Sequence, residues 1–96
     1  FETIKSNGDI EVIKDSANTI INTSCEHIEN FTDWYAKIPN GKLVILQSNN
    51  FFEVDEHVNC VNDIDEFKEM APMTELHYMG SKDMTKYTRF MLIGIK

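Results

Sequence analysis

Two histidines each lie close to a cysteine in the sequence, and these four residues are the ones best suited to bind a metal ion. The pairs are Cys25-x-His27 and His57-x-x-Cys60. Thiolate sulfur and imidazole nitrogen are the ligands that structural zinc sites use most. Neither spacing matches the usual zinc-binding pairs, and on a helix the side chains of residues 25 and 27 would point about 200° apart. We therefore expect no metal and no other cofactor, with Cys25 buried and both histidines in solvent.

The same residues are the best candidates for nucleophilic catalysis, because a cysteine nucleophile needs a histidine within reach. Cys25 with His57 or His77 is the set to consider. No glycine turn exposes either cysteine, and the four glycines are too scattered to form a phosphate-binding loop. Carboxylates are abundant, but abundance in an acidic chain does not indicate a matched acid and base. The sequence predicts no catalytic residues and a protein that is not an enzyme.

The two cysteines also allow a second hypothesis, in which they form a disulfide. A Cys25–Cys60 bond would close a long loop and contribute about 3 to 4 kcal/mol in an oxidising compartment. The triplets at 22–24 and 30–32 match the glycosylation acceptor pattern, and the chain begins at Phe1. These features fit an extracytoplasmic ligand-binding or sensory domain cut from a larger protein. The expected location is the cytoplasm, with secretion as the alternative.

Acidic residues are concentrated in the middle of the chain. Residues 53–80 carry eight acids and one base, whereas residues 81–96 carry one acid and four bases. Calcium binding is not expected, because a loop starting at Asp63-x-Asp65 would place Thr74 where the terminal Glu belongs. The acids at the start of a helix would instead be stabilised by the helix dipole. The tract has seven carboxylates: Glu53, Asp55, Glu56, Asp63, Asp65, Glu66 and Glu69.

The charge and hydropathy of the chain exclude several classes of partner. A net charge of −7 and a single arginine argue against direct nucleic-acid binding, which depends on Lys and Arg. The longest apolar runs, 43–46 and 90–93, are far shorter than the roughly 20 residues of a membrane helix, so no membrane partner is expected. The acidic tract is either an ordinary solvated face or a surface that docks onto a basic protein groove, including one that normally holds nucleic acid. We favour the second interpretation, a small inhibitor or binding module in which Trp34 anchors the interface.

The first half of the chain predicts a hairpin followed by a helix. Apolar residues on both sides of Asn7-Gly8 indicate a β-hairpin within residues 1–14. Signals conflict over residues 15–24, which fit either a strand or the start of a helix. A capping box from Thr23 to Glu26 would begin that helix, and Pro39 would end it. Its apolar face consists of Cys25, Ile28, Phe31, Tyr35 and Ile38.

The second half predicts two further hairpins and a second helix. Residues 43–47 form an apolar run that Ser48-Asn49-Asn50 would turn back into a strand at 51–54. Apolar residues between Val61 and Ala71 have helical spacing and predict a short helix. Asn62 would cap this helix, and Pro72 would end it. The last hairpin joins residues 76–79 to 87–95 through a loop at 80–83, and its second strand is apolar enough to lie centrally in the sheet.

Hairpins that alternate with helices predict an α+β fold. We expect a two-layer domain with a mostly antiparallel sheet of five or six strands and two helices on one face. Ninety-six residues suffice for one core, so residues 1–96 are predicted to form a single compact domain of undetermined oligomeric state.

Overall fold

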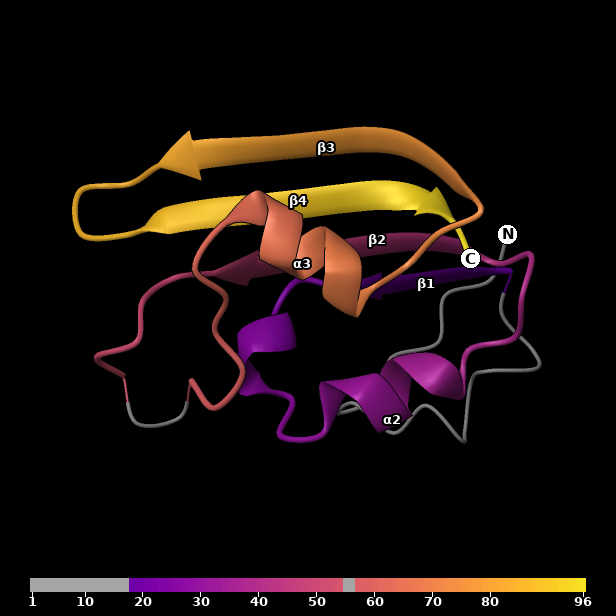
Figure 1. The fold of residues 1–96 in the computed structure, drawn as a ribbon, viewed down its shortest axis with the longest axis horizontal. Helices are drawn as coiled ribbons and strands as arrows, with labels where there is room; N and C mark the ends of the chain where they lie inside the picture. The colour runs from indigo at the N-terminus through magenta and orange to yellow at the C-terminus, as the bar shows by residue number, and fades with distance from the viewer. Residues whose placement is uncertain (1–17, 55–56) are drawn as a thin grey trace.

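A computed structural model of the chain describes residues 18–54 and 57–96, which form a four-stranded sheet and two α-helices (Figure 1). The hairpin predicted within residues 1–14 lies outside the described residues. The elements, in chain order, are β1 (Thr19–Asn22), a 3-10 turn η1 (Cys25–His27), α2 (Phe31–Ala36), β2 (Leu43–Asn49), α3 (Ile64–Met70), β3 (Glu75–Asp83) and β4 (Thr88–Ile95).

The sheet is mixed, whereas the sequence predicted a mostly antiparallel one. Its strand order is β1-β2-β4-β3, with β1 parallel to β2 and the other neighbours antiparallel. The chain between β1 and β2 contains both η1 and α2, which makes it long enough for the crossover that parallel strands require. The α+β class is therefore confirmed, but the described residues contain four strands rather than five or six.

The second predicted hairpin is wrong, because the chain leaves the sheet after β2. Both edges of β2 are already occupied, one by β1 and the other by β4. The buried side chain of Asn49 accepts a hydrogen bond from the Phe51 backbone N–H at 3.1 Å. The Asn49 carbonyl accepts one from the Val61 N–H at 3.1 Å. Residues 51–54 therefore begin a loop and not a strand.

The single helix predicted from residue 25 to residue 38 is divided into η1 and α2. Ile28 separates them with an extended backbone, at φ −87° and ψ 109°. The expected capping box is absent, since Ser24 precedes η1 without a side-chain capping bond. The periodic apolar residues nevertheless all contact the core: Cys25, Phe31, Tyr35 and Ile38 are buried, and Ile28 packs against them. The spacing identified the core face correctly but not the continuity of the helix.

The last hairpin and the second helix are close to their predictions. β3 pairs with β4, and β4 lies centrally as expected. β3 extends through the residues predicted as a loop, so the turn lies between Met84 and Tyr87. α3 begins after Asp63 rather than after Asn62, because the Asp63 carboxylate accepts a hydrogen bond from the Glu66 N–H.

One face of the sheet carries the core, and both helices pack on it. Alternate residues of β2 and β4 point to this face, where they meet the buried aromatic side chains of α2 and Phe67 of α3. The opposite face carries half-exposed apolar residues of β2 and β4, such as Ile45 and Ile93, and Ile21 of β1, which is 60% exposed. Within the described part of the chain, no helix is long and apolar enough to cross a bilayer. The sheet and helices together bury Ile20, Val44, Leu46, Phe90 and Leu92 under Phe31, Trp34, Tyr35 and Phe67.

Candidate functional site

The acidic residues of α3 lie at its start and along its exposed side. Asp63 caps the helix, a position that the sequence analysis assigned to Asn62, and Asp65 and Glu66 occupy its first turn, as predicted. Glu69 is exposed one turn later, and Glu53 is exposed in the loop after β2. Asp55 and Glu56 lie outside the described residues. The density of charge at the helix start is stabilised by the backbone N–H groups there and needs no bound cation.

Glu66 and Glu69 line a groove between the two helices. The groove has a volume of about 530 Å³, and its lining residues are Thr32, Tyr35 and Ala36 of α2, Glu66, Glu69 and Met70 of α3, Pro72 and Lys96. Its walls thus combine apolar carbon with two carboxylates. The sequence pointed to the carboxylates, but their position next to α2 follows from the packing of α3 on the sheet.

Tyr35 and Lys96 are held in place at one side of this groove. The Tyr35 hydroxyl donates a hydrogen bond to the Pro72 carbonyl at 2.7 Å. Burial raises the pKa of Tyr35 to about 12. The Lys96 ammonium lies 5.0 Å from the Tyr35 ring centroid and donates to the Ile38 carbonyl, and burial lowers its pKa. The lysine therefore directs its donors at backbone oxygens.

Trp34 lies in the core and not on the acidic surface. Its side chain is 8% exposed, and its indole packs on Phe31 with ring centroids 5.6 Å apart. The indole Nε1 is buried and has no hydrogen-bond partner within residues 18–54 and 57–96. Since so little of the ring reaches the surface, Trp34 in this conformation does not offer the exposed anchor that the sequence suggested.

A second group of polar side chains lies where the parallel strands β1 and β2 end. η1 follows β1, and the loop with His57 follows β2, so both segments lie at the same end of the sheet (Figure 1). The Asn59 N–H donates to the Glu26 carbonyl at 2.9 Å, and the Asn59 side chain donates to the Cys25 carbonyl at 3.3 Å. These bonds join two segments that are about thirty residues apart in the sequence.

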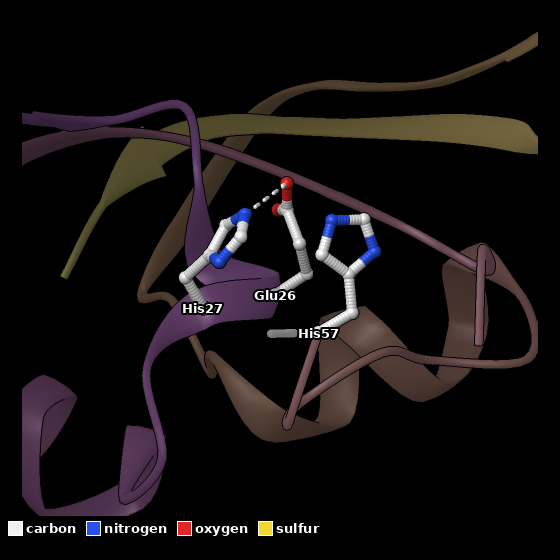
Figure 2. A group of neighbouring side chains, drawn as sticks. All are labelled: Glu26, His27 and His57. Atoms are coloured by element: carbon white, nitrogen blue, oxygen red, sulfur yellow. Dashed lines mark ion pairs between the residues drawn. The ribbon is translucent and has the colours of Figure 1, made fainter. Parts of the chain in front are cut away.

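Glu26, His27 and His57 converge at this end of the sheet. Each offers one ligand atom, and these atoms all lie within 4.8 Å of one another. The two imidazole rings meet edge to face with their centroids 4.7 Å apart, and Figure 2 shows the Glu26 carboxylate beside them, next to His27 Nε2. Glu26 Oε1 lies 3.9 Å from His27 Nε2. Glu26 is 6% exposed, and its second oxygen, Oε2, is buried without a hydrogen-bond partner in the described part of the chain.

Neither cysteine belongs to this group, so the four-ligand set considered from the sequence does not form. The Cys25 thiol donates to the Asn22 carbonyl, and the Cys60 thiol lies 3.4 Å from two oxygens, Asn49 Oδ1 and the Phe51 carbonyl. Burial raises the pKa of both thiols, and the Glu26 carboxylate raises it further. Both cysteines are free, so the structure lacks the Cys25–Cys60 disulfide of the alternative hypothesis.

Sequence reasoning placed both histidines in solvent and assigned Glu26 to a helix cap. His27 is indeed exposed, but His57 is half-buried and Glu26 is buried beside them. The adjacent Glu26-His27 pair was the available signal, yet nothing in the spacing pointed to His57 as its neighbour.

Comparison of the chain with protein-family models, with curated proteins and with solved structures gave no match. The function has to be inferred from the two sites themselves.

Proposed function

We propose that this protein is a non-enzymatic binding module that accepts a basic, amphipathic segment of a partner protein. The observation that carries this function is the groove between α2 and α3, in which Glu66 and Glu69 stand beside the apolar surface of Ala36, Met70 and Pro72.

The two components of the groove suit different parts of such a segment. Apolar side chains of the partner would be removed from water against Ala36, Met70 and Pro72, which supplies affinity. Lys or Arg side chains would reach the carboxylates of Glu66 and Glu69 at the rim, where charge pairs raise the association rate and select the orientation. The Lys96 ammonium already donates to the backbone carbonyls of Ala36 and Ile38. It therefore competes only weakly with a cationic partner group for the carboxylates of Glu66 and Glu69.

The charge of the segment that contains α3 also supports a cationic partner. Residues 53–80 hold eight acids against one base, so the field around α3 attracts positive segments before contact. The alternative expected from the sequence is an inhibitor that docks its acidic surface onto a basic groove of another protein, including a nucleic-acid-binding groove. The cytoplasmic location predicted from the sequence remains part of the same proposal.

A short amphipathic helical peptide whose polar face carries only lysine is a suitable probe. Its affinity is measured by fluorescence anisotropy at low salt and at about 0.5 M salt, where the Debye length falls below about 5 Å. Chemical-shift perturbation in NMR spectra maps the contact. We expect binding that weakens with salt, shifts centred on Ala36 and Met70, and no binding of the same peptide carrying glutamate.

Matched variants separate the groove from overall charge. The double substitution Glu66→Gln and Glu69→Gln is expected to weaken peptide binding about tenfold, which corresponds to about 1.4 kcal/mol. The pair Glu29→Gln and Glu75→Gln changes the net charge equally at exposed positions away from the groove. Equal losses in the two double variants, or shifts that avoid the groove, would show that the groove is not the binding site.

A further inference from the structure

The geometry at the ends of β1 and β2 points to a second site: we propose that Glu26, His27 and His57 bind one divalent transition-metal ion, with zinc as the preferred ion. The spacing of cysteines and histidines had predicted no metal. This site lies outside the α2–α3 groove and shares none of its residues.

The ligand atoms are already close to the arrangement that zinc requires. With Zn–N and Zn–O distances of about 2.0 to 2.2 Å, two ligands of a tetrahedral ion are about 3.4 Å apart. Glu26 Oε1 and His27 Nε2 are 3.9 Å apart, and all three ligand atoms lie within 4.8 Å. Movements of about an ångström in side chains would therefore suffice to close the site around an ion.

His57 is oriented as a metal ligand. Its Nδ1 lies 2.9 Å from the Phe51 carbonyl oxygen. A carbonyl can only accept, so Nδ1 carries the proton and, in the neutral ring, Nε2 keeps its lone pair. Figure 2 shows Nε2 on the side of the ring that faces the Glu26 carboxylate. A backbone carbonyl that fixes the tautomer in this way is the usual outer partner of a metal-bound histidine.

The buried carboxylate provides independent support. The Glu26 side chain is 8% exposed, and its Oε2 has no hydrogen-bond partner among the residues that the structure describes. Burying a carboxylate oxygen without a partner is unfavourable, because the group loses its water without compensation. A cation held between Glu26 and the two imidazoles would supply that missing interaction.

The donor set selects the type of ion. Two imidazole nitrogens and one carboxylate suit zinc and neighbouring transition metals, whereas calcium and magnesium prefer oxygen ligands alone. Three protein ligands leave a fourth tetrahedral position for a water molecule, and the 45% exposed side chain of His27 puts one ligand of the site at the surface.

The backbone around the site keeps the two histidines together. η1 and the segment after His57 are joined by both hydrogen bonds of Asn59, to the carbonyls of Glu26 and Cys25. The site is therefore partly organised before an ion arrives, which lowers the cost of binding.

The test is a titration of the metal-free protein with zinc chloride, in which isothermal calorimetry measures the heat of binding. We expect one ion per chain, no competition from calcium or magnesium, and the absorption of a tetrahedral site when cobalt(II) is used instead. Glu26→Gln, His27→Ala and His57→Ala are each expected to weaken zinc binding at least tenfold.

His77 provides a matched control, because it forms a similar but exposed pair, with its Nε2 3.6 Å from Glu75 Oε2. His77→Ala is expected to leave zinc affinity unchanged. NMR signals of the imidazoles supply a readout that needs no variant: zinc should shift those of His27 and His57 but not those of His77. Absence of saturable binding, an equal effect of His77→Ala, or shifts at all three histidines would overturn the proposed site.

Discussion

Asp63 is one of the acids expected from the sequence to bind a partner, and the structure gives it a role in the fold that can be measured. Its Oδ1 accepts a hydrogen bond from the Glu66 N–H at 2.8 Å, at the start of a helix of only seven residues. Replacing an N-cap aspartate by alanine costs about 1 kcal/mol, within a range of about 0.5 to 2. A domain of this size has a free energy of unfolding of about 5 to 15 kcal/mol. The loss is therefore a measurable part of the total.

The loss at Asp63 should appear in global unfolding rather than in fraying of α3. Phe67 and Ala71, within and just after α3, are almost fully buried, so the helix cannot detach without exposing the core. Urea denaturation followed by the fluorescence of Trp34, the single tryptophan, reports that transition. For a domain of 60 to 100 residues, about 1 kcal/mol corresponds to a fall in Tm of about 4 to 8 °C.

Two further variants separate the hydrogen bond from the charge. Asp63→Asn keeps the acceptor and loses only the charge, so we expect a loss of a few tenths of a kcal/mol. Asp65→Ala removes an equivalent exposed charge from the first turn without removing the cap. If Asp63→Ala were no more destabilising than Asp65→Ala, the capping role assigned to Asp63 would be refuted.

Two other predictions concern buried ionisable groups. Burial raises the pKa of Tyr35 from 10.0 to about 12, so the folded protein keeps a phenolic proton that the unfolded chain loses above about pH 10. The stability that comes from this shift is present below pH 10.0 and is lost towards pH 12. The difference in unfolding free energy between the wild type and Tyr35→Phe should therefore shrink over this range. A constant difference would contradict the burial of the hydroxyl. Because burial also raises the pKa of both thiols, iodoacetamide should modify Cys60 slowly and Cys25 more slowly still in the folded protein, and both promptly in urea. Rapid modification of Cys25 in the folded state would show that its thiol is accessible.

Local signals in the sequence predicted several elements correctly. The long apolar run at 90–93 identified β4 as a central strand, and Pro72 ended the second helix close to its predicted position. The three- and four-residue spacing from Cys25 to Ile38 predicted the residues that face the core. These successes share a cause: each depends on the conformational preference and burial of residues close together in the chain.

The predictions were wrong for two segments, residues 51–54 and the region around Ile28, where the rest of the fold outweighed the local sequence. Residues 51–54 have the composition of a strand, but β2 already has β1 and β4 as neighbours, and the Asn49 side chain directs the chain away. Similarly, the helical spacing continued across Ile28, although its backbone is extended. Neither the occupied edges of β2 nor the extended backbone at Ile28 can be recognised within a short window of sequence.

The same division applies to the two candidate sites. The sequence alone determined that the molecule is acidic, that its acids gather around the second helix and that its histidines and cysteines lack the spacing of a zinc motif. The meeting of Glu26 and His27 with His57 was decided by the tertiary structure. Parallel pairing of β1 with β2 puts the segments that follow them at one end of the sheet, and Asn59 joins these segments by hydrogen bonds. That juxtaposition depends on strand order, which is set by the packing of the whole domain and not by the residues of the site.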